Sequence, residues 1–511
     1  MSAERGRPAR PEGPGGEASR LDLTPLFEPR GVVVAGASTH PGKFGFVALH
    51  NVLDAGFEGP VFATNPERPS VLGIQTLASV DEVPEGVADL VMVCAPGAAI
   101  PEVLRQSAAK GIRGAFVVSG GFRELGEEGL RAEQELVALA EELGMVLAGP
   151  NGQGLVSTPA KLWSQIVAPY PPAGRIGIAS QSGNLVSTVM NLARQGNVGI
   201  SRAVSAGNQA MVGIADYLDY MAADDETAVV IVYVEGVPDG RRFFESLRAA
   251  TATKPVIVVK GGVSESGARA AASHTGSLAS DDRVFDGMLS QAGAIRAPGI
   301  DVAYHLAATF ATNPLPKGPR TVVLTTAGGW GVLTADAVAA SDLELMELPA
   351  DLHDAIGELV PPRWSRSNPV DLAGGETRDT IPAVIDLICG HPDVDALVYI
   401  GLGIQGNTAR AYRESHVASA DDADPELVEG MARMAGFHER QEERYARAVV
   451  ETSHRHGKPI IVASELGIAD PANPGPATLR ELGWPCLPSP AAAVGALAAM
   501  WSHQRRRDAT T

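Results

Sequence analysis

His274 is the side chain with the clearest capacity for chemistry, because small residues surround it on both sides. It lies in the segment GARAAASHTGSLASDD, residues 267–282. A neutral imidazole is a competent nucleophile toward phosphoryl groups, and a loop of small residues lets it approach a ligand closely and move. An exposed loop histidine without a chemical role is the competing interpretation. The sequence therefore offers a candidate phosphoryl acceptor.

Glu235 is a candidate for the group that fixes the tautomer of this histidine. It lies at the end of the apolar run AVVIVYVEGV (228–237), while the run PVIVVKGG (255–262) precedes the histidine segment. The carboxyl ends of neighbouring parallel strands meet at one edge of a sheet, so a carboxylate there could accept the imidazole N–H. Spacing alone does not establish this pairing, and a surface turn is the alternative.

Two turns rich in small residues could hold a phosphate. The segments SQSGN (180–184) and TTAGGWG (325–331) each present small residues at the predicted start of a helix. The first N–H groups of a helix and its positive dipole end attract anions. Two such ends that face each other would bind an anion strongly. A single one is weak evidence, because Gly and Ser favour N-cap positions anyway.

A third turn, GASTHPGKFG (36–45), could hold a different phosphate group. It lacks the GxGxxG spacing of a dinucleotide site. It is not a Walker A loop either, because five residues separate Gly36 from Gly42 and Phe44 replaces the Ser or Thr that would hold magnesium. Lys43 could pair with a phosphate as a point charge, and a surface lysine on a tight turn is the equally weighted alternative.

The other strand ends in this part of the chain carry small residues and prolines. They are Asn65 with Pro66, Ala95 with Pro96, Ser119 with Gly120 and Gly121, and Gly149 with Pro150 and Asn151. Each one alone indicates an ordinary turn. Four of them in register predict a shallow cleft for an extended ligand.

The elements that must position these residues follow a pattern that occurs three times. An apolar β-branched run, a Gly- or Ser-rich turn and a helical stretch follow one another from residues 30, 174 and 320. This alternation predicts an α/β fold of three doubly wound domains with parallel sheets. Proline-containing joints place the domains at 22–158, 160–312 and 318–505, with a disordered tail over 1–21 and a short tail over 506–511. Residues 405–447 predict an exposed helical excursion within the third domain.

Composition narrows the functional classes. The 511 residues carry a formal net charge of −19, which disfavours non-specific binding to nucleic acid or anionic membrane. Three widely spaced cysteines indicate neither a disulfide framework nor a zinc site, and His454 and His456 lack a third metal ligand nearby. The N-terminal segment lacks the apolar core of a signal peptide, and no apolar run reaches the ~18 residues of a membrane span. We therefore expect a cytoplasmic protein without a metal, membrane or nucleic-acid partner of its own.

Taken together, the motifs resemble one family. LFEPRGVVVAGASTHPGKFGFVALHNVLDAGF resembles the CoA-binding domain of the NDP-forming acyl-CoA synthetases, the superfamily of ADP-forming acetyl-CoA synthetase and succinyl-CoA synthetase. IGIASQSGNLV, SAGNQA and YVEGV resemble its second domain, and ARAAASHTGSLA resembles its phosphohistidine loop. TTAGGWGVLTADA and RSNPVDLAGG resemble its third domain. The resemblance covers about residues 22–505. It implies a Rossmann-like CoA-binding domain followed by two flavodoxin-like domains of the succinyl-CoA synthetase type.

The resemblance also implies a reaction, acyl-CoA + phosphate + NDP ⇌ acid + CoA + NTP, that is, an acid–thiol ligase. In it His274 would be the phosphoryl acceptor and Glu235 would orient it. The phosphate would lie at the two helix ends that carry Ser182, Gly183 and Asn184, and Gly329, Trp330 and Gly331. The residues expected to line the CoA cleft are Gly36, Ser38, Lys43, Asn65, Pro66, Pro96, Ser119 and Asn151.

Two substitutions and one absence depart from the family pattern. Gly152 stands where the family's GPNC motif has cysteine, and Ser280 replaces a glycine after the histidine. No stretch of the chain could house the family's ATP-grasp domain, so a separate ATP-grasp β subunit that binds ATP or ADP and Mg²⁺ is the expected partner in a hetero-oligomer. The alternative is a regulatory protein that binds CoA or acyl-CoA and has lost this partner. An NAD-linked oxidoreductase is disfavoured by the missing GxGxxG.

Overall fold

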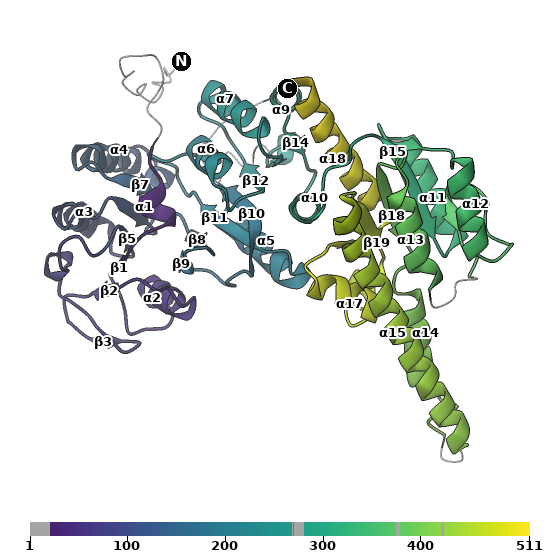
Figure 1. The fold of residues 1–511 in the computed structure, drawn as a ribbon. Helices are drawn as coiled ribbons and strands as arrows, with labels where there is room; N and C mark the ends of the chain where they lie inside the picture. The colour runs from purple at the N-terminus through teal and green to yellow at the C-terminus, as the bar shows by residue number, and fades with distance from the viewer. Residues whose placement is uncertain (1–20, 268, 270–280, 375–378, 421–423, 511) are drawn as a thin grey trace.

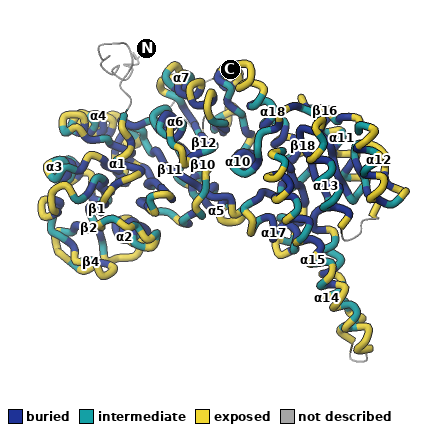
Figure 2. The backbone as a smooth tube through the Cα atoms, viewed as in Figure 1, coloured by how far each residue is buried: buried dark blue, intermediate teal, exposed yellow. Residues whose placement is uncertain are grey.

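The computed structural model describes residues 21–267, 269, 281–374, 379–420 and 424–510, and these form three α/β units along the chain (Figure 1). His274 lies outside the described residues. The apolar strands are buried in all three units, as Figure 2 shows in dark blue. In the first unit, for example, the run VVVA of β1 (Val32–Ala35) is buried at every position. Such continuous burial is typical of a parallel strand with helices on both faces of its sheet.

The first sheet has five strands, all parallel, in the order β2-β1-β5-β6-β7. The strands that join β1 are β2 (Val61–Thr64), β5 (Leu90–Val93), β6 (Gly114–Val117) and β7 (Val146–Ala148). Helices α2 (Phe44–Asp54), α3 (Ile100–Ala109) and α4 (Glu127–Glu142) cover it, and the short α1 (Thr24–Phe27) precedes β1. A separate two-stranded ribbon pairs β3 (Ser70–Val71) with β4 (Ile74–Gln75).

The second sheet has seven strands in the order β14-β13-β12-β10-β11-β8-β9. Its strands are β8 (Gly154–Ser157), β9 (Leu162–Gln165), β10 (Ala173–Ser180), β11 (Ile200–Ser205), β12 (Val229–Val234), β13 (Val256–Lys260) and β14 (Ile295–Arg296). Its helices are α5 (Gly183–Gly196), α6 (Ile214–Ala223), α7 (Gly240–Thr251), α9 (Asp282–Ala292) and α10 (Ile300–Thr312). Strands β8 and β9 run antiparallel to their neighbours, so this sheet is mixed.

The third sheet has six strands. Five follow the order β16-β15-β18-β19-β20, and β17 pairs with β15 beside this path. They are β15 (Arg320–Thr325), β16 (Glu344–Leu345), β17 (Val370–Asp371), β18 (Ala396–Ile400), β19 (Ile460–Ala463) and β20 (Cys486–Leu487). The helices are α11 (Gly328–Ala339), α12 (Ala350–Leu359), α13 (Thr380–Gly390), α14 (Ile404–Arg413), α15 (Pro425–His456), α16 (Leu466–Ala469), α17 (Pro474–Glu481) and α18 (Pro490–Thr510).

The predicted fold class is confirmed, since each unit is an α/β layer structure built on parallel strands. The exact boundaries 22–158, 160–312 and 318–505 stay a prediction, although β8 already pairs in the second sheet before residue 158. The predicted helical excursion at 405–447 is confirmed. Helices α14 and α15 form an arm that projects from the third unit and is largely exposed away from its base (Figures 1 and 2).

The three units share continuous apolar cores. One core cluster joins the first and second sheets, and another joins the second and third sheets through α5, α10 and α18. The packing of α10 against α18 in this second cluster holds the second and third units together. None of the described helices combines the length and the apolar composition that crossing a membrane requires.

His503 lies in this contact, and its pKa predicts a pH-dependent stability. Its side chain in α18 is 4% exposed and stands edge-on to Phe310 of α10, with the ring centroids 5.8 Å apart. Burial, together with the nearby charges of Arg507 and Arg506, lowers the pKa of His503 to about 4. An unfolded histidine titrates near pH 6.5, so between these values the unfolded state binds more protons and stability falls as pH falls.

The expected loss for wild-type protein is ~1.4 kcal/mol per pH unit below pH 6.5, or roughly 2 kcal/mol at pH 5, from this group alone. Thermal melting at pH 7 and pH 5 should therefore show a larger drop in midpoint for wild type than for His503→Leu, which cannot titrate. Equal drops for the two proteins would show that His503 protonates freely in the folded state.

Candidate active site at the carboxyl ends of the strands

Glu235 follows β12 at the carboxyl edge of the second sheet and is 8% exposed. Its Oε1 accepts a hydrogen bond of 3.1 Å from the hydroxyl of Tyr233, whose pKa the burial of the ring raises well above its usual value. Its Oε2 is buried and has no hydrogen-bond partner among the described residues. A buried carboxylate oxygen without a partner is costly, so this atom is suited to accept an N–H from a group that arrives there.

Gln181 ties Glu235 to the start of α5. Its side-chain oxygen accepts the backbone N–H groups of Glu235 and Gly236, and its amide nitrogen donates to the carbonyl of Gly236 over 2.7 Å. The turn that carries Ser182, Gly183 and Asn184 therefore lies beside Glu235. The structure thus brings together two of the groups that the sequence predicted separately.

Ser180 shapes the turn from β10 into α5. Its buried hydroxyl accepts the N–H of Ser182 at 3.0 Å and donates to the carbonyl of Ser182 at 2.7 Å. The side chain of Ser182, at the N-cap of α5, makes no capping hydrogen bond with the described residues. A Cβ on Gly183 would lie 2.1 Å from the side-chain carbon Cδ of Gln153, so a larger residue there would require the Gln153 side chain to move. The first N–H groups of α5 remain available for an anion.

The start of α11 repeats this turn at the end of β15. The Thr325 hydroxyl accepts the N–H of Ala327 at 3.0 Å and donates to its carbonyl at 3.1 Å. Here, however, a carboxylate is already present, because a Cβ on Gly328 would lie 2.8 Å from Oδ2 of Asp371. A carboxylate at a helix N-terminus is itself favourable and repels a second anion. The ends of α5 and α11 are therefore alike in backbone and different in charge.

Gly329, Trp330 and Gly331 lie in the first turn of α11, on the third sheet, as predicted from the pattern. Their joint action with α5 on one phosphate stays a prediction.

The predicted CoA residues lie along the carboxyl edge of the first sheet, where hydrogen bonds join successive strand ends. The Asn65 amide donates to the carbonyl of Ala37 over 2.8 Å, and the Ser119 hydroxyl donates to the carbonyl of Ala95 over 2.6 Å. The N–H of Asn151 donates to the carbonyl of Ser119 over 3.1 Å. The residues of this edge are Gly36, Ser38, Lys43, Asn65, Pro66, Pro96, Ser119 and Asn151.

This edge allows a ligand to approach the backbone closely at Gly36. Gly36 has φ +90°, and a Cβ there would lie 2.9 Å from the carbonyl carbon of Cys94. The backbone can therefore come close to a ligand at this turn. Lys43 is exposed at the N-cap of α2, where its charge can reach a phosphate.

Residues 149–154 connect the two edges. The carbonyl of Pro150 accepts the N–H of Asn208, which follows β11, over 2.8 Å, and the N–H of Gln153 donates to the Ser205 hydroxyl over 3.1 Å. A Cβ on Gly152 would lie 2.6 Å from the carbonyl oxygen of Ser205. The cysteine of the related motif would therefore need a different backbone or neighbour here.

Sequence reasoning missed four residues of this region: Gln153, Gln181, Lys260 and Asp371. Lys260 ends β13 and is 7% exposed, and burial lowers its pKa. Its ammonium lies 5.3 Å from the ring centroid of Phe285. A lysine at the end of an otherwise apolar strand could have been recognised in the sequence as a candidate site residue. The two glutamines carried none, because a single amide in a turn has no characteristic spacing.

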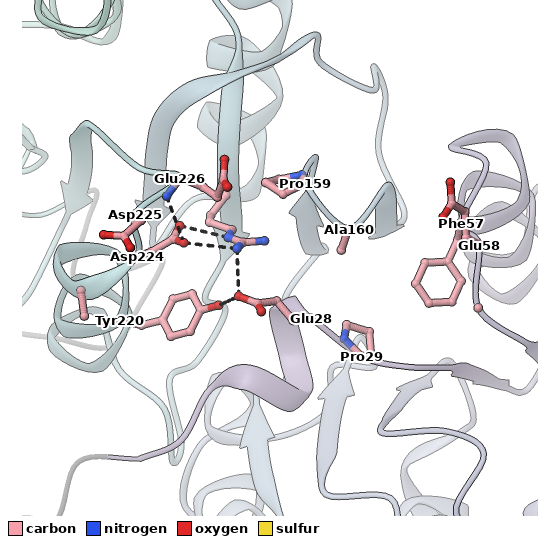
Figure 3. Close-up of a pocket in the computed structure, with 13 residues that line it drawn as sticks. Glu28, Pro29, Phe57, Glu58, Pro159, Ala160, Tyr220, Asp224, Asp225 and Glu226 are labelled. Atoms are coloured by element: carbon pink, nitrogen blue, oxygen red, sulfur yellow. Dashed lines mark hydrogen bonds and ion pairs between the residues drawn. The ribbon is translucent and has the colours of Figure 1, made fainter.

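A cavity of about 670 Å³ lies elsewhere, between the first and second units (Figure 3). Arg202, 2% exposed, binds Asp224 at 3.1 Å and Glu28 at 2.9 Å beside it. Asp224, Asp225 and Glu226 precede β12, so this cavity opens at the amino ends of the strands. It contains none of the predicted site residues, and its ion pairs join the two units.

Comparison with known proteins agrees with this geometry. The chain matches the models of a CoA binding domain at residues 30–157, a succinyl-CoA ligase like flavodoxin domain at 173–310 and a ligase-CoA domain at 321–462. The α subunit of ADP-forming acetate–CoA ligase I from Pyrococcus furiosus is 34% identical over 491 residues, which cover 95% of this chain and 98% of that protein.

Two further proteins are similar to this chain, one over part of its length and one over nearly all of it. The ADP-forming 4-hydroxybutyrate–CoA ligase of Nitrosopumilus maritimus is 31% identical over 379 residues, or 73% of this chain and 54% of that protein. The solved structure of the dinucleotide forming acetyl-coenzyme A synthetase 1 of Ca. Korarchaeum cryptofilum, in complex with phosphate and ADP, has a TM-score of 0.81 at 30% identity. The matched region covers 95% of this chain and 98% of the chain in that structure. The chain therefore belongs to the NDP-forming acyl-CoA synthetase family, as a relative of the α subunits of ADP-forming acetate–CoA ligases.

Proposed function

We propose that the chain is the CoA-binding, phosphohistidine-bearing subunit of an ADP-forming acid–CoA ligase, with the reaction acyl-CoA + phosphate + ADP ⇌ acid + CoA + ATP. The observation that carries this proposal is the connection between the two strand edges. Residues 149–154 run from the CoA edge of the first sheet to the first turn of α5, next to Glu235. A thioester held on one edge would thus meet a phosphate held on the other.

The reaction then proceeds in three transfers. A phosphate oxygen attacks the thioester carbonyl carbon, the C–S bond breaks, and CoA leaves as thiolate while an acyl phosphate forms. A nitrogen of His274 attacks the phosphorus, the P–O bond to the acyl group breaks, and the acid leaves as carboxylate. Finally a terminal oxygen of ADP attacks the phosphorus, the N–P bond breaks, and ATP forms with neutral histidine.

In these steps the residues of this chain would position the phosphate, the histidine and CoA. The free N–H groups at Gly183 and Asn184 hold the phosphate, and the dipole of α5 stabilises the negative charge that it carries. The unpartnered Oε2 of Glu235 accepts the N–H of the His274 ring nitrogen that does not attack, which fixes the tautomer and stabilises the imidazolium as the N–P bond forms. Lys43 pairs with a phosphate of CoA.

The nucleotide is assigned to a partner. Relatives of this chain are named as α subunits, and the 4-hydroxybutyrate–CoA ligase, of which the chain spans 54%, is about twice its aligned length. These names support a partner subunit, and we propose that it is a separate ATP-grasp β subunit that binds ADP and Mg²⁺ in a cytoplasmic hetero-oligomer. Nothing observed favours the alternative of a regulatory CoA-binding protein. The relatives act on different acids, so similarity does not select the acid.

CoA binding tests the first half of this proposal. Calorimetry on the chain should detect CoA binding that weakens as salt is raised, because contacts to phosphate are charge-assisted and screened. Lys43→Ala should weaken binding about five- to tenfold, the effect of one partly exposed contact of this kind. Lys317→Ala, a change of an exposed lysine far from this edge, should leave affinity unchanged. Binding of NAD in place of CoA would show that the first unit has been misread.

A further inference from the structure

Gln165 is a buried glutamine whose side chain has no partner. It ends β9, is 0% exposed, and neither its amide oxygen nor its amide nitrogen has a hydrogen-bond partner among the described residues. Buried amides are almost always paired with protein or water, so an unpaired one calls for a ligand or a physical explanation. Its backbone carbonyl is satisfied by Asn51, so only the side chain is unmatched.

The side chain of Gln165 lies on the α5 side of the second sheet. Alternate residues of a strand share a face, so Gln165 points the same way as Trp163. Trp163 packs in the core cluster that contains Val186 and Val189 of α5. The residue opposite Gln165 on β8 is Gly154, where an added Cβ would lie 2.4 Å from the Cα of Gln165. The segment that follows is fixed to α5 by the Ser187 hydroxyl, which donates to the carbonyl of Ala168 over 2.6 Å.

Gln153 provides a second unmatched amide oxygen at the same place. Its Oε1 is buried without a partner among the described residues. Its amide nitrogen reaches only a long 3.5 Å contact with Oδ1 of Asn184, and its side chain lies against Gly183 in the first turn of α5. Both glutamines come from the open end of the β8–β9 hairpin, where the N–H of Ile166 donates to the carbonyl of Gln153 over 2.8 Å, and Gln153 lies against the helix start that is proposed to hold phosphate.

This location is where the acyl group must lie, because the acyl carbon exchanges between the CoA sulfur and the phosphate. Residues 149–154 connect the CoA edge to α5, and Gln153 belongs to that segment. Amides offer both a donor and an acceptor, which matches a hydroxyl group. Gly183 and Asn184, which lie against Gln153, and Gly154, which lies opposite Gln165, carry no charge, so these residues offer no cation to a second carboxylate.

We propose that Gln153 and Gln165 determine the acid specificity of this chain and that its substrate is a short carboxylic acid bearing a neutral hydroxyl group. The inference rests on the proposed function and goes beyond it by naming the substrate class. A hydroxyl satisfies the amides, whereas an alkyl chain leaves them unpaired.

The test measures CoA thioester formation by the complex of the chain with its ATP-grasp partner, using acids matched in length. The pairs are propionate with lactate and butyrate with 3-hydroxybutyrate and 4-hydroxybutyrate, and succinate is added as a dicarboxylate. Wild type should favour the hydroxy acid of at least one pair about 100-fold or more in kcat/KM. Gln165→Leu and Gln153→Leu should reduce that preference at least tenfold and improve the alkanoate, while Gln106→Leu on α3 should change neither.

Each result of this test either supports or overturns the inferred substrate class. Equal or better turnover of the alkanoates, or of succinate, by wild type would overturn the inference while leaving the proposed function intact, and this result does not depend on whether any variant folds. A preference that survives in folded Gln153→Leu and Gln165→Leu would overturn the assignment to these two residues. No thioester from any acid, together with absent CoA binding, would overturn the proposed function and the inference with it.

Discussion

Glu235→Gln is expected to slow phosphorylation of His274 by roughly 10²–10³-fold, the effect of losing one well-placed electrostatic partner in a water-poor site. Glutamine keeps the shape of the side chain and can still be hydrogen bonded by Tyr233. It loses the negative charge that stabilises the imidazolium as the N–P bond forms. The measurement is the rate of phosphohistidine formation in a rapid-quench experiment, with CoA affinity followed in parallel.

CoA affinity should change less than twofold in Glu235→Gln, because Glu235 lies on the second sheet and the CoA edge on the first. Glu245→Gln in α7 is the matched control, since it also removes one carboxylate, which pairs with Arg241 at the surface. Phosphorylation of Glu235→Gln at the wild-type rate would mean that Glu235 serves only the turn after β12. Its buried, unpartnered Oε2 would then need another explanation.

His274→Ala should abolish phosphoryl transfer. No other nitrogen nucleophile is proposed for the site, so both the phosphohistidine label and overall ATP formation should fall to background. CoA binding should remain within about twofold of wild type, because the CoA residues lie on another sheet. His454→Ala is the control, because His454 is an exposed histidine of α15.

A label that persists in His274→Ala, acid-labile and base-stable as in wild type, would assign the phosphoryl group to a different histidine. Loss of CoA binding in the same variant would show a general folding defect, and His274→Asn, closer in size and polarity, then separates chemistry from folding.

Strand and helix positions could be predicted from sequence where local signals were strong. The continuous apolar runs of β1, β12 and β13 are dictated by burial on both faces, and the turns after β10 and β15 have the small residues that a strand-to-helix connection requires. The β8–β9 hairpin was not predicted. Its register is set by the pairing of strands: Ser157 of β8 lies opposite Arg202 of β11, and Gly154 of β8 lies opposite Gln165 of β9. Local periodicity in the sequence does not reveal this pairing.

The candidate site, like the fold, could be predicted from the sequence only in part. Small residues at strand ends predicted which turns could approach a ligand, and the structure places those turns along shared edges. The sequence could not reveal that Asp371 lies at the start of α11, or that Gln181 joins the α5 turn to Glu235. Both contacts depend on how distant strands pair. The pairing of Glu235 with His274 stays a prediction, because His274 lies outside the described residues.

The most direct test of the account uses this chain alone, without nucleotide or partner. It carries both proposed sites, for CoA and for phosphate, so a panel of acyl-CoA thioesters that includes acetyl-CoA and hydroxyacyl-CoAs, incubated with labelled inorganic phosphate, should transfer label to the protein. Peptide mapping under basic conditions should place that label on His274, and one CoA should be released for each phosphoryl group bound. Label on another residue, or CoA release without any phosphohistidine, would contradict the account.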